Sequence, residues 1–190
     1  MAAPTLRADA ARNLELILEA AEESFAEKGH EASVADIATR AGVGQATIFR
    51  RFETKDDLIA AVFERKLVQL VEAAEAAARK KRAWDGLMAF MAVVTELQLK
   101  DRGFFQSIAE QMMERKHVVE LKTRVKGAMT DVVERAKVEG DLRADMSPED
   151  VFAFCCAAAQ AATMGPNASP RAAKRYLSVM TDGMRATRAA

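Results

Sequence analysis

The stretch GVGQATIFRRF, residues Gly42–Phe52, decides the fold. Two glycines come before a short run that combines apolar residues with Gln, Thr and two Arg, and so short a segment cannot form a core of its own. On a helix of 3.6 residues per turn, Ile48 and Phe52 share one face with Val43 just before it. We expect these three residues to anchor a helix over Gln45–Arg51. The positions left for its other faces are Gln45, Ala46, Thr47, Phe49, Arg50 and Arg51.

The residues before Gly42 indicate two further helices. A first helix is expected from about Ala11 to Lys28, ended by Gly29. Ser33 stands three residues before Asp36, an acidic variant of the capping box, and begins a short second helix. Gly42 permits the left-handed backbone that a sharp turn needs, so the second and third helices form a helix-turn-helix. The apolar positions behind the first helix are Leu14, Ile17, Leu18, Ala21 and Phe25, and those behind the second are Val34, Ile37, Ala38 and Ala41.

The chain after Phe52 is helical throughout in its pattern. Thr54 and Asp57 repeat the cap and start a long fourth helix that runs to about Lys80, with an apolar stripe wide enough to join a small domain to a larger body. We expect five more helices over Trp84–Leu99, Phe104–Arg115, Val118–Val138, Pro148–Met164 and Pro170–Thr187, the last two capped by Ser147 and Ser169. The sequence therefore predicts an all-α fold of about nine helices. Its two parts are a three-helix domain with the helix-turn-helix over residues 1–55 and a larger helical domain over residues 56–190.

Charge and composition limit the possible partners. The 190 residues carry 28 basic and 28 acidic side chains, so bulk charge draws the chain neither to nucleic acid nor to a membrane. An anionic partner must meet a local patch, and Arg40, Arg50, Arg51 and Lys55 lie close together around the turn and the third helix. DNA affinity depends on phosphates neutralised locally rather than on net charge.

The same composition indicates a cytoplasmic protein that does not span a membrane. The N-terminus lacks the apolar segment of a signal peptide, and the longest apolar run, Val151 to Met164, is shorter than the roughly 20 residues of a membrane span. Cys155 and Cys156 are adjacent and poorly placed for a disulfide, and buried core residues are the preferred interpretation over a thiol sensor. His30 and His117 stand far apart, so neither a metal site nor a cofactor is expected.

The polar face of the third helix carries side chains that can recognise DNA. Gln and Arg can form bidentate hydrogen bonds to base edges in the major groove, and Thr can bond a base or a phosphate. Ala46 leaves room for a close approach, and Lys55 adds positive charge where exposed N–H groups at a helix start also favour a phosphate. Spacing alone leaves open a small helical unit with a solvated basic face.

Residues 10 to 62 resemble the DNA-binding domain of the tetracycline-repressor (TetR) family of transcriptional regulators. The resemblance is carried by ILEAAEESFAEKG, SVADIATRAGVG and QATIFRRFETKDDLIAAV, which are continuous over some fifty residues. It implies that Gln45, Ala46, Thr47, Phe49 and Arg51 face DNA, that Lys55 meets a phosphate, and that Ser33 and Val34 lie near the DNA backbone. Arg50 belongs to the same basic face.

Two positions depart from the family pattern. Phe49 stands where the family usually has Tyr, so a hydroxyl–phosphate bond is unavailable, and Arg51 stands where His is frequent. Arg51 can compensate, because its permanent charge suits either a phosphate or a guanine.

The resemblance also implies a ligand-responsive homodimer. The last two helices would pair with those of a second subunit, presenting two recognition helices to a palindromic operator. The middle helices would enclose a pocket for a mostly apolar small-molecule effector whose binding releases DNA. Candidate lining residues, each of which can equally be plain core, are Trp84, Met88, Met91, Phe104, Phe105, Met112, Met113 and Met129.

Three other functions are an enzyme, a protein-binding adaptor and a transcriptional activator. An enzyme lacks support, since the sequence offers no nucleophile–base pair, phosphate loop or clustered carboxylates. A helical protein-binding adaptor and an activator without ligand response remain open alternatives.

Overall fold

The structure is a computed structural model that describes residues 3–101, 104–112, 115–164 and 169–186. Within these ranges it is all-α, which confirms the predicted fold class, and the one β-type pairing is an isolated antiparallel bridge between Leu142 and Arg185. The helices are α1 Ala3–Lys28, a 3-10 turn Gly29–Glu31, α2 Val34–Ala41, α3 Gln45–Phe49, α4 Lys55–Ala78, α5 Ala83–Asp101, α6 Phe104–Met112, α7 Lys116–Val138, α8 Pro148–Ala161 and α9 Pro170–Met184.

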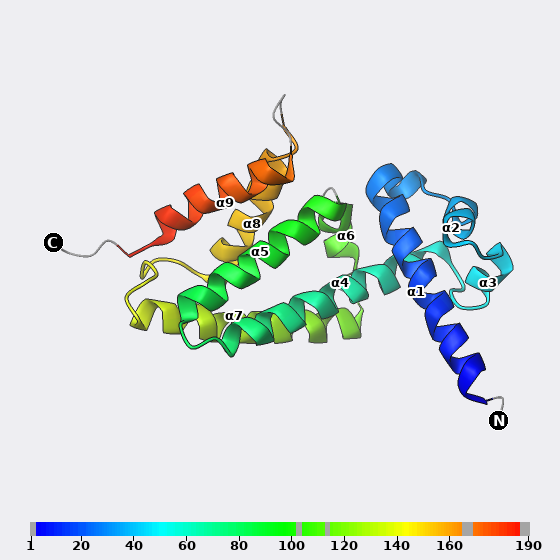
Figure 1. Cartoon of the computed structure of the whole chain (residues 1–190), viewed down its shortest axis with the longest axis horizontal. Helices are drawn as coiled ribbons and strands as arrows, with labels where there is room; N and C mark the ends of the chain where they lie inside the picture. Colours follow the sequence, from blue (N-terminus) through cyan, green and yellow to red (C-terminus); the bar gives the residue numbers. More distant parts are fainter. Residues whose placement is uncertain (1–2, 102–103, 113–114, 165–168, 187–190) are drawn as a thin grey trace.

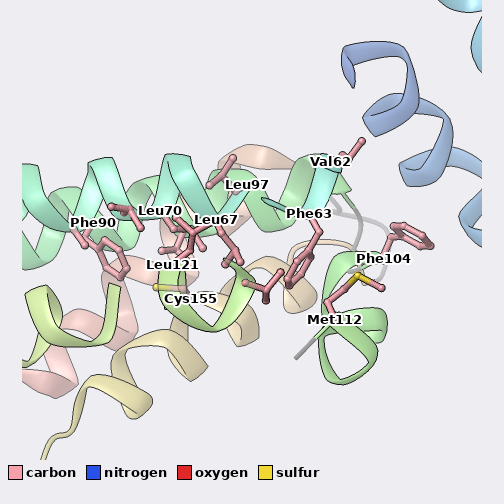
Figure 2. Close-up of a cluster of buried hydrophobic side chains, with 14 of the residues drawn as sticks. Val62, Phe63, Leu67, Leu70, Phe90, Leu97, Phe104, Met112, Leu121 and Cys155 are labelled. Carbon is pink, nitrogen blue, oxygen red and sulfur yellow. The ribbon is translucent and has the colours of Figure 1, made fainter. Parts of the chain in front are cut away.

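Helices α1 to α3 gather at one end of the molecule, and the other helices form an elongated body (Figure 1). Helix α4 starts beside α1 and reaches into the body between α5 and α7, so a single element belongs to both parts. Figure 2 shows the body core along α4, where Phe63, Leu67 and Leu70 lie among side chains from α5, α7 and α8. Helices α8 and α9 pair with each other on the α5 side of the body.

Helix starts and stops follow the local sequence signals closely. Ser33, Thr54 and Ser147 each accept a hydrogen bond from the backbone N–H three residues on, and the acid at that position bonds back, so all three capping boxes are present. Gly29, Gly42 and Gly140 have φ values of 56°, 69° and 75°, which only glycine adopts without strain. The signals that set these boundaries lie within a few residues of each other in the chain.

Some helix lengths differ from the prediction. Helix α1 starts at Ala3 rather than Ala11, and Pro4 is compatible with this start because the N–H that proline lacks has no helical partner in the first turn. Helix α3 ends at Phe49, two residues before the expected Arg51. Helices α8 and α9 end early at Ala161 and Met184.

The early end of α9 has a tertiary cause. Beyond Met184 the chain turns extended and exchanges backbone hydrogen bonds with the α7–α8 loop. Arg143 N–H donates to the Met184 carbonyl at 3.0 Å, and Ala186 N–H donates to that of Asp141 at 3.1 Å. This pairing ties the C-terminal end of α9 to the loop before α8.

None of the helices, over the residues that the structure describes, is long and apolar enough to cross a bilayer.

Candidate nucleic-acid interface and effector pocket

Helix α3 has only five residues, about one and a half turns, and its apolar side packs against the core. Ile48 is 1% exposed and Phe52 is 9% exposed, and Val43 packs against the same core, as the spacing predicts. After Phe49 the helical hydrogen bonds continue through the turn, with Phe52 N–H donating to the Ile48 carbonyl at 2.8 Å. The residues of the opening stretch therefore divide between an anchoring side and an outward side.

The outward side carries most of the residues expected to face DNA. Gln45, Ala46, Arg50 and Arg51 are exposed, Thr47 is half-buried, and Phe49 leaves 50% of its surface in solvent. Among the residues that the structure describes, neither Arg50 nor Arg51 pairs with a carboxylate. At the start of α2, Ser33 is exposed and Val34 is half-buried, and the Ser33 hydroxyl is engaged as the cap of that helix.

Two other basic residues of the expected patch have partners within the domain. Arg40 forms ion pairs with Glu23 at 3.3 Å and Glu27 at 2.5 Å, and the hydrogen bond that its guanidinium donates to Glu27 raises the pKa of Arg40. Lys55 donates from Nζ to the backbone carbonyl of His30. Arg40 therefore fixes α2 against α1. Among the described residues, Arg50, Arg51 and Lys55 have no carboxylate partner and supply the positive charge of this surface.

The part of α1 from Asp9 to Ile17 borders the α3 region, and the expected start at Ala11 left Asp9 out of this helix. Asp9 and Asn13 of α1 line the same hollow of about 410 Å³ as Thr47, Arg50 and Arg51. A signal was present, because the segment before Ala11 is rich in alanine and contains no helix-breaking residue after Pro4.

The DNA-binding end is joined to the body through α6 and the start of α7. Phe104 of α6 stacks on Phe25 of α1 with ring centroids 5.3 Å apart, and it meets the His30 ring edge-on at 5.2 Å. Arg115 forms an ion pair with Asp57 of α4 at 3.3 Å. The hydrogen bonds from Thr54 and Arg115 lower the pKa of the Asp57 carboxyl.

The structure distributes the candidate effector residues over several places. Trp84 and Met91 are buried in the body, Met88 is half-buried, and the Arg185 guanidinium lies over the Trp84 ring at 4.2 Å. Phe104 and Met112 lie together on α6, near the DNA-binding end of the core (Figure 2). Met113 and the side chain of Phe105 lie outside the described residues.

Met129 alone of this set lines an open, mostly apolar pocket in the described part of the body. This pocket has a volume of about 410 Å³ and is bounded by α4, α5, α7 and α8. Its lining residues are Leu67, Leu70, Phe90, Lys122, Val125, Lys126, Met129, Pro148, Glu149 and Phe152. Figure 2 shows Leu67, Leu70 and Phe90 near one another along α4 and α5.

Buried polar side chains in the body were not anticipated from the sequence. Lys66 of α4 is 8% exposed, and burial lowers its pKa to about 8, against the opposing influence of Glu22. Thr95 and Gln98 of α5 are also buried. Burial raises the pKa of the Cys155 thiol to about 12, which leaves it protonated and agrees with a core role. Lys66 ends the charged run Glu64–Lys66, so the sequence alone suggests a solvated lysine.

Two family models match this chain. The model of the tetR family of bacterial regulatory proteins matches residues 17–62, which hold α2, α3 and the start of α4. The model of the C-terminal domain of SbtR-like transcriptional regulators matches residues 82–186, more than half of the chain.

Two curated relatives match over part of their length. A fatty acid metabolism regulator protein of Bacillus subtilis is 31% identical over 99 residues, covering 44% of this chain and 51% of the relative. A helix-turn-helix transcriptional repressor of Mycobacterium tuberculosis is 42% identical over 73 residues, covering 36% of this chain and 39% of the relative. The matched part of the chain thus spans about half the length of the first relative and less of the second.

Solved structures match over nearly the whole chain. A TetR transcription regulatory protein of Mycobacterium vanbaalenii has a TM-score of 0.68 at 26% identity, covering 95% of this chain and 99% of that one. The FadR regulator of Bacillus subtilis, solved with stearoyl-CoA, has a TM-score of 0.65 at 19% identity, covering 90% and 98%, and shares the fold. With its helix-turn-helix, its helical body and both family models, the chain belongs to the TetR family of bacterial transcriptional regulators and is not an enzyme.

Proposed function

We propose that this regulator is a cytoplasmic homodimeric repressor that binds a palindromic operator and leaves it when a small-molecule effector enters the helical body. Residues 1–55 serve as the DNA-binding domain and residues 56–190 as the effector-binding and dimerisation domain. The observation that carries the proposal is the outward side of α3. It carries exposed Gln45 and half-buried Thr47, and the turn directly after it adds Arg50 and Arg51, which have no carboxylate partner among the described residues.

The residues of this surface have distinct roles in the proposal. Gln45, Thr47 and Ala46 meet base edges, because the N-terminal end of a recognition helix enters the major groove. Arg50 and Arg51 provide charge for phosphate or guanine, and Phe49 packs its exposed ring against the DNA backbone or a thymine methyl group. Ser33 and Val34 approach the adjacent strand, and Lys55 lies near a phosphate. Asn13 of α1 joins the set, since it lines the hollow shared with Arg50 and Arg51.

The proposed dimer uses α8 and α9. Large apolar side chains here are exposed to solvent: Phe152 on α8, Met164 just after α8 and Val179 on α9, with exposed fractions of 38%, 66% and 65%. Burial of such groups against a second copy stabilises association by roughly 25 cal/mol for each Å² removed from water. A two-fold dimer then places two copies of α3 on one face of the DNA.

The proposed effector binds within the body. The name of one relative, a fatty acid metabolism regulator, and the stearoyl-CoA bound by a structural neighbour favour an effector with a long apolar part. The apolar pocket lined by Met129 suits such a ligand. The junction formed by Phe25, Phe104, Asp57 and Arg115 connects the body to the DNA-binding domain.

The test is a fluorescence anisotropy titration of the full chain against DNA upstream of its own gene at moderate salt. We expect a higher affinity for this DNA than for a scrambled duplex, and a strong fall in affinity as the salt concentration rises. Equal affinity for the two duplexes would favour the protein-binding adaptor. A reporter that gains expression when the regulator is deleted supports a repressor, and one that loses expression supports an activator.

A further inference from the structure

The apolar pocket of the body has more positive than negative side chains in its described lining. Its floor is formed by Leu67 and Leu70 of α4 and Phe90 of α5, and its rim by residues of α7 and α8. Lys122 and Lys126 stand one turn apart on α7 and both line this rim, and Glu149 of α8 is the one acid among the lining residues that the structure describes. Two cations therefore face one anion around an apolar floor.

The acid at the rim is already paired. Lys126 Nζ lies 2.9 Å from the Glu149 carboxylate, and both side chains are well exposed, at 70% and 63%. The hydrogen bond from Lys126 lowers the pKa of Glu149, so this carboxylate is charged at neutral pH. The neighbouring acid Asp150 is bound to the Ser147 hydroxyl in the cap of α8. Exposed pairs of this kind contribute little to stability, so a competing anion can replace Glu149 at small cost.

We propose that this pocket binds a medium-chain carboxylate, with its chain against Leu67, Leu70 and Phe90 and its carboxylate between Lys122 and Lys126. The inference rests on the proposed function, because it names the chemical class of the effector. Lysine stems can cover the apolar wall while their ammonium groups stay at the rim, where they meet an anionic head group.

The size of the pocket limits the length of the chain. About 410 Å³ lies at the lower end of the 300–1,000 Å³ found for small-molecule sites and equals the volume of roughly fourteen water molecules at about 30 Å³ each. A ligand of about a dozen non-hydrogen atoms fills it. A fatty carboxylate of about ten carbons meets this limit, whereas the nucleotide part of a coenzyme A thioester would have to lie outside.

The position of the pocket gives its occupant a route to the DNA-binding domain. Leu67 and Leu70 lie on α4, whose first residues carry the Thr54 cap and the Asp57–Arg115 ion pair. Glu149 lies in the first turn of α8, one of the proposed dimer helices. A carboxylate that replaces Glu149 on Lys126 therefore changes a contact of both α7 and α8.

Isothermal titration calorimetry of the full chain with decanoate tests the proposal, with decanol as the neutral partner of equal length. We expect decanoate to bind at least tenfold more tightly than decanol. Lys122→Met and Lys126→Met should each remove most of this preference while leaving decanol binding in place. The matched control is Lys116→Met, which changes an exposed lysine of the same helix outside the pocket and should behave as the unchanged protein.

Other outcomes overturn the inference. Equal binding of decanol and decanoate, no detectable binding of either, or decanoate binding that is unchanged in both pocket variants would each show that the two lysines do not select an anion. Tighter, lysine-dependent binding of decanoyl-CoA would assign the site to a thioester instead of a free carboxylate. Operator binding is measured separately, so a protein that binds its operator but not decanoate contradicts this inference and leaves the proposed function standing.

Discussion

Phe49, the last residue of α3, and Arg51, in the turn that follows it, have opposite chemistry. Phe49 leaves half of its surface in solvent but has no hydrogen-bonding group, while Arg51 is exposed and has no carboxylate partner among the described residues. A planar guanidinium can bind a phosphate oxygen or a guanine edge in two-point fashion. Arg51 is thus the side chain best placed to replace the hydroxyl that Phe49 lacks.

Substitution of these two residues separates phosphate binding from base reading. Arg51→Ala should weaken operator binding by about 1–3 kcal/mol, as expected for the loss of one good contact. If Arg51 binds phosphate, the fall is equal on operator and scrambled DNA, and Phe49→Tyr in the Arg51→Ala protein restores about 0.5–1.5 kcal/mol. Anisotropy titrations measure both, with Arg79→Ala at the end of α4 as the control. Unchanged affinity in Arg51→Ala would remove Arg51 from the interface.

Lys66 is a buried cation that costs stability in the native protein. Its pKa of about 8 lies below the 10.5 of a solvated lysine, so between these values the unfolded chain holds more protons. The Lys66 contribution to the free energy of unfolding therefore rises with pH from about 8 to 10.5. A difference of that size corresponds to at most about 3 kcal/mol, since one pKa unit equals 1.36 kcal/mol.

Lys66→Met should therefore stabilise the protein at pH 7 by about 1–3 kcal/mol, and the gain should shrink as pH rises toward 10. Urea unfolding of both proteins at several pH values gives the difference. The comparison between them is needed because burial raises the pKa of Cys155 and Cys156, whose contribution to stability falls over alkaline pH. A pH-independent gain would show that Lys66 is solvated in the native state.

At the scale of elements, helices α4 and α5 meet through a glycine. A Cβ added at Gly86 would lie 2.3 Å from the backbone carbonyl oxygen of Ala77, a contact that no side-chain movement can relieve. Gly127 of α7 is also helical, but a Cβ there would meet nothing within 4 Å. Two glycines in similar helical positions thus have opposite structural roles.

Gly86→Ala should destabilise the protein by about 1–3 kcal/mol or more, because α4 and α5 must separate to admit the methyl group. Gly127→Ala should stabilise it by roughly 0.5–1 kcal/mol, since alanine loses less backbone entropy in a helix than glycine. Thermal unfolding followed by circular dichroism measures both. The expectation fails if the two variants shift the melting temperature in the same direction.

Features that depend on neighbouring residues could be predicted from the sequence, whereas features that depend on tertiary packing could not. Capping boxes such as Ser33 with Asp36, and the glycine stops at Gly29 and Gly42, act within a few residues, so the starts and stops of several helices could be located from the sequence. The anchoring side of α3 was also predictable from its spacing. The burial of Lys66 and the pocket shared by α4, α5, α7 and α8 depend on residues far apart in the chain, and the close approach at Gly86 depends on how α4 and α5 pack after the turn that joins them.

At the scale of the whole molecule, the proposed dimer makes DNA affinity depend on α8 and α9. Val179 of α9 and Val138 at the end of α7 are both exposed valines, at 65% and 88%, but only Val179 lies on a proposed dimer helix. Val179→Glu should place a charge in the interface and dissociate the dimer, because an unpaired buried charge is costly. Val138→Glu should leave it intact.

Light scattering after size-exclusion chromatography measures the mass of each variant, and anisotropy gives its operator affinity. We expect Val179→Glu to run as a monomer and to bind the palindromic operator at least tenfold more weakly. A dimeric Val179→Glu protein would place the interface elsewhere on the surface.

Because α4 is continuous, a small tilt at one end produces a larger displacement at the other end. Its 24 residues span about 36 Å, since a helix rises 1.5 Å per residue, and they run unbroken from Lys55 beside the DNA-binding helices to Ala78 (Figure 1). A tilt of about 5° about its far end would move the start of the helix by roughly 3 Å, close to one base-pair step of DNA. In a two-fold dimer both copies of α4 would tilt, so a ligand that shifts α4 slightly can change the spacing of the two recognition helices and prevent both from entering the major groove.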